Sequence, residues 1–365
     1  MRNDQIKVLM LLPNLRVSNG VTSYAMNYFR RLDHSRVRMD FAVYKDRDNP
    51  YEEEIRAAGS NVFILPPLKS VLSHYNACRK ILNEGKYDIV HDNSLLVTYP
   101  MMKVAGKHSA VRILHSHNSK LGDSAKKEKR NARFLPHLLK QTDKYAACSD
   151  LAAKALFGDA SYEFIPNVID AENYCFNTDT RAEIRRVMKA TDKKIIATVG
   201  RVSAQKNPFF ALDVFDIVAE RDPEAEYWWI GSGALDKTVS DYVATMKHGD
   251  QVRLLGSRND MRDLYQAIDL FFLPSLFEGL PITGVEAQAM GLPCVISDTV
   301  TKEVVYTDLV RFVSLQESKE KWAGIICELL NRTGEREGRT EDLIGSVFAS
   351  NNAGVHLEQY YRNLL

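Results

Sequence analysis

This sequence has no CxxC cysteine pair, no long apolar run and almost no net charge. The five cysteines of the 365-residue chain are scattered and none belongs to a CxxC pair, so neither a disulfide framework nor a cysteine zinc site is expected. The apolar run Ile6–Leu12 is too short to span a bilayer and lacks a small-residue cleavage site. We therefore expect a cytosolic chain without a transmembrane helix.

The formal net charge of +1 conceals an uneven distribution. Residues 1–170 carry 26 Lys and Arg against 18 Asp and Glu, whereas residues 171–365 carry 22 against 29. The basic side chains are densest at Lys120, Lys126, Lys127, Lys129, Arg130, Arg133, Lys140 and Lys144. This density suits either a solvated helix face or contact with anionic lipid headgroups. No recognised nucleic-acid-binding motif accompanies it, so nucleic acid is not an expected partner.

Short apolar runs alternate with amphipathic stretches along the chain, which is typical of βαβ units and mainly parallel sheets. In the first half the expected strands are Ile6–Leu12, Met39–Tyr44, Asn61–Leu65, Ile89–His91, Val111–His115 and Lys144–Ala147. In the second half they are Lys194–Val199, Tyr227–Ile230, Val252–Leu254, Leu270–Leu273 and Pro293–Ile296. The pattern predicts an α/β protein.

The length favours two similar domains over one long sheet. The join is expected in FIPNVID, Phe164–Asp170, where Pro166 and Asn167 break a strand-like run. This predicts an N-terminal domain at residues 1–170 and a C-terminal domain at 171–345. Residues 346–365 are expected to form a helix that packs back on the first domain. Its expected apolar face consists of Leu357, Tyr360, Tyr361, Leu364 and Leu365.

One loop carries two carboxylates close to an expected anion site. It is PSLFEGLPITGVEAQAMGLP, residues 274–293, and it places seven residues between Glu278 and Glu286. Ligands of open α/β sheets bind beyond the carboxyl ends of the strands. Two carboxylates there suit sugar hydroxyls, which donate to them. The structural alternative for Glu286 is a residue near a helix start, favoured by the helix dipole.

The same loop also predicts the anion site itself. Gly279 and Pro281 mark a tight turn from strand to helix, with the helix starting at about Ile282. Backbone amides near Leu280 and Ile282 then lie at a helix N-terminus, where they can face an incoming phosphate.

A second loop supplies two cations. It is VGRVSAQKNP, residues 199–208, and it follows the expected strand Lys194–Val199. Arg201 and Lys206 project from it toward the same sheet edge. Such a pair can neutralise a diphosphate without a metal ion.

Two further loops follow strands of the first domain. In the first, Asn19 and Gly20 both tolerate a left-handed backbone, so the chain there can approach a ligand closely. The second is HSHN, with His115 and His117. Metal binding would need a third ligand that the sequence does not supply at a recognisable spacing. A histidine that donates to a sugar hydroxyl or to the backbone is favoured instead.

Together EGLPITGVEA, GRVSAQK, FIPNVID, the NG loop and HSHN resemble the retaining glycosyltransferases of family 4, from Ile6 to the C-terminal helix. The resemblance implies the GT-B fold, with two Rossmann-like domains whose parallel sheets face a central cleft. It also implies an N-terminal acceptor-binding domain and a C-terminal domain that binds the nucleotide-sugar. Many such enzymes in bacteria build capsule, exopolysaccharide or lipid-linked glycans.

The resemblance also implies roles for individual residues. Glu286 would hold the nucleotide ribose, Glu278 the donor sugar hydroxyls, and Arg201 with Lys206 the diphosphate. Gly20 would contact the donor phosphate, and the backbone amides around Gly279, Leu280 and Ile282 would face the phosphates. The nucleobase would lie near Arg258, and His117 or His115 would contact the transferred sugar. The family often has two glycines in the first loop, where this chain has Asn19–Gly20.

Other functions have weaker support. Asp46–Arg47–Asp48 matches a metal-binding DxD, but it lies in a polar loop and such short matches arise by chance. Gly231 and Gly233 are followed by Asp236 where a dinucleotide motif needs its third glycine. A GT-B-fold nucleotide-sugar epimerase and a non-catalytic nucleotide-sugar-binding regulatory protein are the remaining alternatives.

The sequence thus predicts a retaining, metal-independent hexosyltransferase that needs no cofactor besides its co-substrate. The expected donor is a UDP- or GDP-sugar. The expected acceptor is a hydroxyl of a glycan or polyprenyl-linked glycan, in capsule or exopolysaccharide synthesis. The expected location is the cytoplasm, with peripheral attachment at the inner face of the cell membrane through the basic half.

Overall fold

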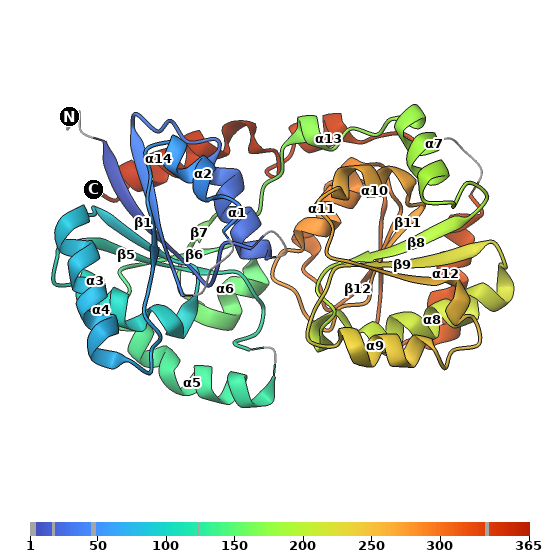
Figure 1. Cartoon of the computed structure of the whole chain (residues 1–365), viewed down its shortest axis with the longest axis horizontal. Coiled ribbons are helices and arrows are strands. Elements are labelled where there is room, and N and C mark those ends of the chain that lie inside the picture. The colour runs from blue at the N-terminus through green and yellow to red at the C-terminus, as the bar shows by residue number, and fades with distance from the viewer. Residues whose placement is uncertain (1–4, 17–18, 45–48, 123, 333–335) are drawn as a thin grey trace. The chain divides into compact units, whose positions relative to one another are not determined.

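The computed structural model describes residues 5–16, 19–44, 49–122, 124–332 and 336–365. The chain divides into two compact units (Figure 1). The N-terminal unit comprises Met1–Val168 together with Ser350–Leu365, and the C-terminal unit comprises Ile169–Ala349. The chain therefore crosses between the units within FIPNVID and returns at Ser350.

The N-terminal unit is built on a parallel sheet with strand order β3-β2-β1-β4-β5-β6-β7. Its strands are β1 (Ile6–Leu12), β2 (Val37–Val43), β3 (Val62–Ile64), β4 (Ile89–Asp92), β5 (Val111–Ser116), β6 (Lys144–Ala147) and β7 (Glu163–Phe164). The six strands expected in this half are confirmed to within two residues at each end. Apolar runs form these strands because both faces of the sheet are covered by helices.

The helices of this unit are α1 (Gly20–Phe29), α2 (Glu52–Ala57), α3 (Val71–Gly85), α4 (Tyr99–Ala105), α5 (Ala125–Leu139), α6 (Asp150–Phe157) and α14 (Ala353–Asn363). The strand order turns at β1, which pairs with β2 on one side and with β4 on the other. Such a reversal opens a crevice at the carboxyl ends of the strands. Beyond those ends lie the segments after β1, β4 and β5.

The C-terminal unit repeats this winding with strand order β10-β9-β8-β11-β12-β13, again all parallel. Its strands are β8 (Lys194–Val199), β9 (Ala225–Ile230), β10 (Val252–Gly256), β11 (Leu270–Leu273), β12 (Cys294–Ser297) and β13 (Val310–Val313). The five expected strands are confirmed, and β13 was not predicted. The reversal lies at β8 and β11, which are paired neighbours, so the two loops expected to carry the site leave adjacent strands.

The helices of the C-terminal unit are α7 (Thr178–Val187), α8 (Pro208–Arg221), α9 (Asp236–Val243), α10 (Met261–Ala267), α11 (Ile282–Ala289), α12 (Lys319–Leu330) and α13 (Thr340–Ile344). The core on one face of its sheet contains Trp229 of β9 and Trp322 of α12. Trp228, the third tryptophan of the chain, is also buried on β9. Tryptophan fluorescence therefore reports on this unit alone.

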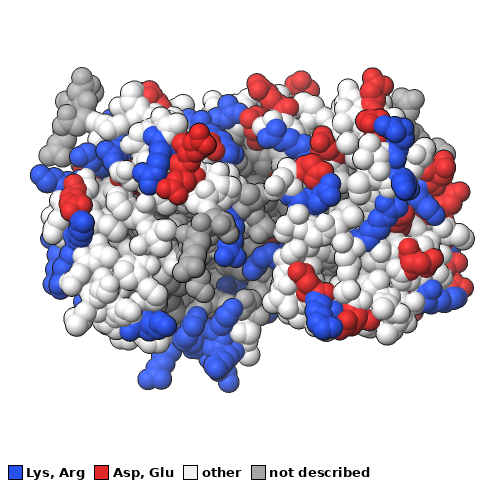
Figure 2. Space-filling view, viewed as in Figure 1, with Lys and Arg blue, Asp and Glu red and all other residues white. Residues whose placement is uncertain are grey.

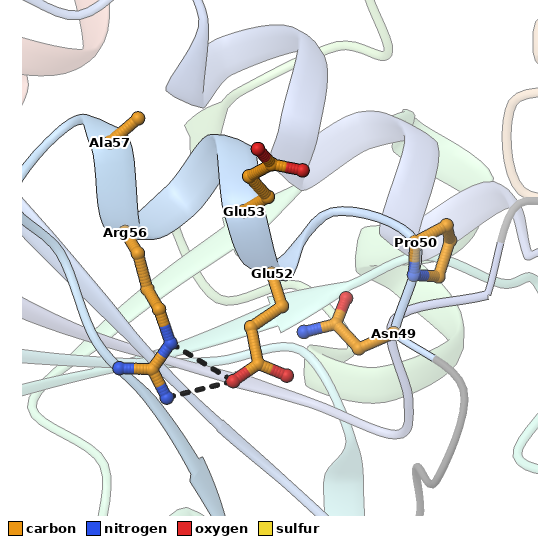
Figure 3. Close-up of a pocket in the computed structure, with 6 residues that line it drawn as sticks. All are labelled: Asn49, Pro50, Glu52, Glu53, Arg56 and Ala57. Carbon is orange, nitrogen blue, oxygen red and sulfur yellow. Dashed lines mark hydrogen bonds and ion pairs between the residues drawn. The ribbon is translucent and has the colours of Figure 1, made fainter.

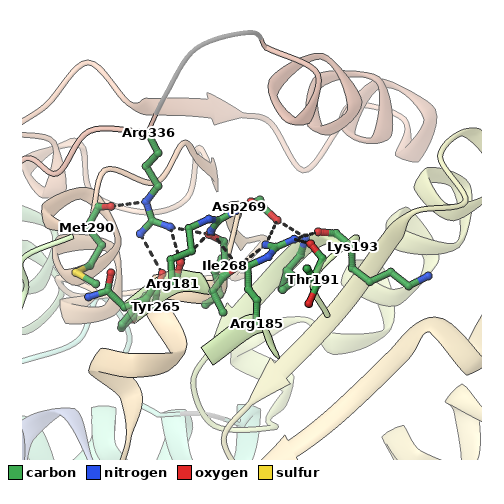
Figure 4. Close-up of polar contacts among 12 residues, drawn as sticks. Arg181, Arg185, Thr191, Lys193, Tyr265, Ile268, Asp269, Met290 and Arg336 are labelled. Atoms are coloured by element: carbon green, nitrogen blue, oxygen red, sulfur yellow. Dashed lines mark hydrogen bonds and ion pairs between the residues drawn. The ribbon is translucent and has the colours of Figure 1, made fainter. Parts of the chain in front are cut away.

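A network of arginines ties the segment after residue 335 to the sheet (Figure 4). The carboxylate of Asp269, just before β11, is paired with Arg181 and Arg185 of α7. Arg336 stacks on the ring of Phe176 and donates to four backbone carbonyls, those of Tyr265, Gln266, Ile268 and Met290. A guanidinium suits this task because it presents several donors in one plane.

The C-terminal helix differs from the sequence prediction. A continuous helix over residues 346–365 is wrong, because α13 ends at Ile344 and α14 begins only at Ala353. Between them Ala349 bridges to Ile169. Leu357 and Tyr361 of α14 are buried in the core of the N-terminal unit, but Leu365 is 61% exposed because it lies beyond the end of the helix.

A glycine at the start of α14 allows this close packing. A Cβ atom on Gly354 would lie 1.9 Å from the carbonyl oxygen of Arg31, just after α1. By contrast, a Cβ on Gly324 of α12 would have no atom closer than 3.6 Å. We predict that Gly354→Ala destabilises the N-terminal unit by about 1–3 kcal/mol, since α14 must shift away from the backbone.

Urea denaturation of Gly354→Ala should show an earlier transition in circular dichroism, with the tryptophan fluorescence transition unchanged. The matched Gly324→Ala should leave circular dichroism at least as stable as wild type, because alanine favours the helix. An unchanged Gly354→Ala curve would contradict the packing described for α14.

Candidate active site

Two glycines bring the strand ends of the C-terminal unit close together. Gly200 follows β8 with φ +151°, and Gly231 follows β9 with φ +137°. A Cβ on Gly231 would lie 2.1 Å from the carbonyl oxygen of Gly200. Only glycine fits this approach, which sets the course of the loop that carries Arg201 and Lys206.

Glu278 lies at the centre of a buried polar cluster that joins the loops after β8 and β11. Its Oε1 is 2.8 Å from Nζ of Lys206 and accepts a hydrogen bond of 2.7 Å from Ser275. Its Oε2 accepts from Nε2 of Gln205 at 3.1 Å. The structure thus brings Glu278 and Lys206 together, and part of the Lys206 charge is compensated by this carboxylate.

Gln205 links Arg201 to the same cluster. Its Oε1 accepts from the guanidinium of Arg201 at 3.4 Å, while its backbone carbonyl accepts from the N–H of Leu276 at 2.8 Å. Nε2 of Gln205 also donates to the carbonyl of Phe277. Arg201 itself is exposed. Gln205 was not singled out from the sequence, although its place beside Lys206 in GRVSAQK was a signal for it.

Glu286 lies on α11 and shares no hydrogen-bond partner with Glu278 among the described residues. Two tyrosines hold its carboxylate. Tyr174 donates to Oε1 at 2.7 Å and Tyr265 to Oε2 at 2.8 Å. Burial raises the pKa of Glu286 above its ordinary value, although the two tyrosine hydrogen bonds act in the opposite direction. Each carboxylate oxygen has a second lone pair, so ligand hydroxyls can still donate to it. Neither tyrosine could be placed here from sequence, since they are distant in the chain.

The start of α11 lies in the turn after Glu278. Pro281 is its N-cap residue and provides no side-chain cap, while Gly279 and the buried Leu280 form the turn before it. Within the described ranges, no group accepts from the backbone N–H of Ile282 or Thr283. These N–H groups lie at the positive end of the helix dipole, which favours an anion.

Arg258 follows β10 and forms an ion pair with Asp260, with Nε 2.8 Å from Oδ1. This pairing raises the pKa of Arg258 and lowers that of Asp260. Among the described residues, no hydrogen bond or ion pair joins Arg258 to Glu278, Lys206 or Glu286.

In the N-terminal unit Gly20 is the first residue of α1. Asn19 caps this helix, because its side chain accepts from the N–H of Val21 at 3.0 Å. Neither residue adopts the left-handed backbone that both tolerate: Asn19 is extended and Gly20 has no positive φ. Capping requires an extended residue at this position. A Cβ on Gly20 would meet nothing within 4 Å, so close approach of a ligand remains sterically open.

A cluster of histidines lies at the carboxyl ends of β4 and β5. His115 is 1% exposed, and its Nδ1 is 3.2 Å from Nε2 of His91. Nδ1 of His91 is in turn 2.8 Å from the hydroxyl of Tyr361 on α14. Nε2 of His115 is sealed from solvent and has no hydrogen-bond partner in the described parts of the chain. A direct contact from His115 to a ligand, which the sequence left open, is therefore not supported.

His117 lies nearer to solvent than His115. Its ring stacks on that of His115 at 4.0 Å between centroids and lies 4.7 Å from the ring of Tyr24 on α1. Its Nε2 is 2.7 Å from Oδ1 of Asn93, the residue after β4. Burial lowers the pKa of His117 to about 3, so the ring is neutral near pH 7.

A surface hollow at the start of α2 is separate from all of these residues (Figure 3). It is lined by Asn49, Pro50, Glu52, Glu53, Arg56 and Ala57, with Glu52 and Arg56 paired at 2.7 Å. None of the residues expected in the site lines it. The alternative metal motif Asp46–Arg47–Asp48 falls outside the described residues. Elsewhere in the described ranges, no group of three or more His, Cys, Asp or Glu is arranged to hold a metal ion.

Each unit therefore has a doubly wound parallel sheet, with the candidate residues at or next to its strand reversal, as in proteins of the GT-B class. A solved structure of this class, Alr3699/HepE of Anabaena in complex with UDP and glucose, superposes with a TM-score of 0.81. The two are 15% identical, and the match covers 98% of this chain and 100% of that one.

Sequence comparison gives the family. The model described as Glycosyltransferase Family 4 matches residues 18–173, and the model described as Glycosyl transferases group 1 matches residues 179–342. The putative glycosyltransferase EpsF of Bacillus subtilis is 31% identical over 343 residues, which are 89% of this chain and 88% of EpsF. The chain belongs to the family 4 glycosyltransferases with the GT-B fold.

A second relative has a more specific name. The UDP-Gal:alpha-D-GlcNAc-diphosphoundecaprenol alpha-1,3-galactosyltransferase of Escherichia coli is 28% identical over 251 residues. That match covers 65% of this chain and 64% of the E. coli enzyme.

The raised pKa of Glu286 predicts a pH-dependent stability. Its folded-state pKa exceeds the unfolded value of about 4.3, so protonation favours the folded state. This contribution is fully present below the unfolded pKa and is lost as pH rises through the folded one. Glu286→Gln cannot titrate, so the Tm of wild type minus that of the variant should grow as pH falls from 7 to 5.

Glu220→Gln is the control with the opposite sign, because pairing with Lys247 lowers the pKa of the exposed Glu220. Its Tm difference should be small and should stay constant from pH 7 to 5, because its contribution is lost only as pH falls through a pKa below 4.5. Both are measured by tryptophan fluorescence on heating. A Tm difference for Glu286→Gln that stays constant across this pH range would refute the proposed environment of this carboxylate.

Proposed function

We propose that this glycosyltransferase is a retaining, metal-independent hexosyltransferase that uses a nucleotide-diphosphate-sugar. The observation that carries the proposal is the arrangement around Glu278. The loop after β8 supplies Arg201 and Lys206, and the loop after the adjacent strand β11 supplies the Glu278 carboxylate and leads into α11. In the proposal the donor binds here and Glu286 accepts hydroxyls of the nucleoside. The complex of the Anabaena neighbour with UDP and glucose supports a UDP-sugar as donor.

The proposed chemistry follows from charge. As the bond from the sugar to the diphosphate breaks, negative charge develops on the leaving oxygen. Arg201, Lys206 and the N–H groups of Ile282 and Thr283 stabilise that charge, which lowers the barrier to transfer. Lys206 can donate to both Glu278 and a phosphate, because an ammonium group has three protons. The cations thereby take the role that a metal ion has in other transferases.

Retention is proposed because the chain resembles the retaining enzymes of family 4, and the surroundings of Glu278 argue against a covalent route to it. Glu278 is the carboxylate of this cluster, but Ser275, Gln205 and Lys206 already stabilise its charge, which lowers its nucleophilicity. We propose that the acceptor attacks from the face that the diphosphate leaves. The departing phosphate oxygen takes the proton of the acceptor hydroxyl, so no separate base is required.

In this proposal the N-terminal unit binds the acceptor, and His117 contacts the transferred sugar. The name of the E. coli relative, which specifies a sugar on diphosphoundecaprenol, supports a polyprenyl-linked glycan as acceptor. Capsule or exopolysaccharide synthesis, at the inner face of the cell membrane, is the pathway class that fits such an acceptor. None of the helices in the described ranges is long and apolar enough to cross a membrane.

The function is tested by presenting UDP-glucose, GDP-mannose and ADP-glucose in a thermal-shift assay, since a ligand of the folded state raises the Tm. The selected donor is then incubated with undecaprenyl-diphosphate-GlcNAc, with and without EDTA. We expect transfer with the anomeric configuration kept and undiminished by EDTA. Inversion, or loss on chelation that Mg²⁺ restores, would contradict the mechanism, and the second result would implicate Asp46 and Asp48.

The diphosphate site yields a mutational prediction. Arg201→Ala should lower kcat/KM by at least about tenfold, since it removes a charge that stabilises the leaving group. Arg201 is exposed, so folding should be unaffected. Lys206→Ala should lower kcat/KM at least as much, together with the Tm, because Glu278 is left without its cation.

Lys237→Ala is the matched control, since it removes an exposed cation from α9 of the same unit. It should keep wild-type kcat/KM. Wild-type activity in both Arg201→Ala and Lys206→Ala would reject the assignment of the diphosphate site.

Helix α5 supplies the surface for membrane attachment. Leu138 is its sole fully buried residue among those described, and Phe134 is 51% exposed. Lys126, Lys127, Lys129 and Arg130 are all exposed in its first turns. Figure 2 shows blue side chains projecting from the lower edge of the N-terminal unit, where Figure 1 places α5. Basic side chains beside an exposed aromatic ring suit an anionic lipid surface.

We predict sedimentation with phosphatidylglycerol vesicles at low salt but not with phosphatidylcholine vesicles. At about 1 kcal/mol for each basic residue near the surface, the four basic side chains suffice for reversible binding that weakens with salt. Changing all four to Glu should abolish sedimentation while leaving turnover of a short-chain soluble acceptor intact. Equal recovery with both vesicle types would leave α5 as an ordinary solvated helix.

A further inference from the structure

We propose that Asn93 is a positioning residue that fixes the tautomer of His117, so that Nδ1 of His117 accepts a hydrogen bond from a hydroxyl of the sugar ligand. The inference rests on the proposed function for the identity of that ligand. The orientation of the ring and the placement of its proton follow from the N-terminal unit alone.

The orientation of the Asn93 amide is fixed by its neighbours. Its Nδ2 lies 3.2 Å from the backbone carbonyl oxygen of His91 and 2.7 Å from Sδ of Met10. The reversed amide would place two oxygens, neither of which can donate, against each other. The backbone N–H of Asn93 also donates to the carbonyl of Leu11 at 3.0 Å. Oδ1 must therefore face His117.

This orientation determines where His117 carries its proton. Oδ1 of Asn93 is an acceptor and lies 2.7 Å from Nε2 of His117, so Nε2 must donate. A neutral imidazole with a proton on Nε2 has a bare lone pair on Nδ1. The titratable groups facing the ring are Tyr24 of α1, His115 of β5 and His91 of β4. All three are neutral near pH 7, and the lowered pKa of His117 keeps it neutral as well.

The free nitrogen is accessible. In the described parts of the chain Nδ1 of His117 has no hydrogen-bond partner, and the side chain is half-buried, whereas that of His115 is buried. Nε2 of His115 is a buried atom without a hydrogen-bond partner among the described residues, and this separates the two histidines. An accessible acceptor with no donor on the protein is suited to a ligand that donates, and sugar hydroxyls are such donors. Hydroxyl-bearing sugars are thus favoured over those deoxygenated at the contacted position.

The tautomer is measurable without turnover. Histidines are labelled with ¹⁵N, and the signals of His117 among the nine histidines are those lost in His117→Gln. We expect an Nε2 with a proton and an Nδ1 without one, unchanged from pH 6 to 9. A protonated Nδ1 overturns the proposal whether or not the enzyme is a transferase. The selected sugar nucleotide should then shift the Nδ1 signal, whereas its nucleoside diphosphate alone should not.

Kinetics test the positioning role through Asn93→Asp. A carboxylate beside Nε2 raises the pKa of His117, and the imidazolium has no lone pair on Nδ1. A neighbouring charge raises a pKa by about 1–3, so the kcat/KM of the variant relative to wild type should rise by up to about tenfold from pH 5 to 9. A purely structural defect would lower kcat/KM equally at both pH values.

Ser94→Ala is the matched control. The Ser94 hydroxyl is buried and has no hydrogen-bond partner among the described residues, and the side chain adjoins Asn93 in sequence. Its relative kcat/KM should not change with pH. A flat profile for Asn93→Asp, or a sugar nucleotide that leaves Nδ1 unshifted, overturns the proposal. Failure of all donors to bind or react would instead count against the proposed function, while the tautomer measurement still stands.

Discussion

The buried ion pair between Lys206 and Glu278 is the interaction on which the candidate site of the C-terminal unit depends. It joins the loops that follow β8 and β11, the two adjacent strands at which the strand order reverses. Taking two charges out of water costs free energy, which good geometry and further hydrogen bonds must offset. Ser275 and Gln205 supply those bonds, and Gln205 carries the connection on to Arg201. The pair thus joins Glu278 and Lys206 directly and, through Gln205, also Arg201.

The N-terminal unit holds its site by a different means. Its polar residues are neutral and buried, and they form a chain of single hydrogen bonds from Tyr361 to His91 and His115, on which the ring of His117 stacks. In a neutral imidazole one ring nitrogen donates and the other accepts. The position of one proton in such a chain therefore determines the position of the next. The helix α14 contributes Tyr361 to this chain. The C-terminal segment therefore contacts the histidine cluster as well as the core.

Much of this architecture was predictable, for a simple reason. Apolar runs of three to seven residues between amphipathic stretches leave few choices but parallel strands covered by helices, so eleven strands were placed correctly. The loop EGLPITGVEA places its carboxylates by turn geometry that local residues determine. Gly20 shows the limit of such reasoning. Residue type allowed a left-handed turn, but capping of α1 by Asn19 requires an extended backbone instead.

The fold class, the two sheets, the loops that carry the candidate residues and the family could be read from the sequence, because they depend on periodicity and on residues close together in the chain. The partners of those residues were decided only by tertiary structure. Tyr174 and Tyr265 are 112 and 21 residues from Glu286, and Tyr361 is 270 residues from His91. No local pattern encodes such pairs, since they meet only where the winding of each sheet brings distant segments to one edge. The same winding decided which histidine keeps an accessible nitrogen and which is sealed in the core.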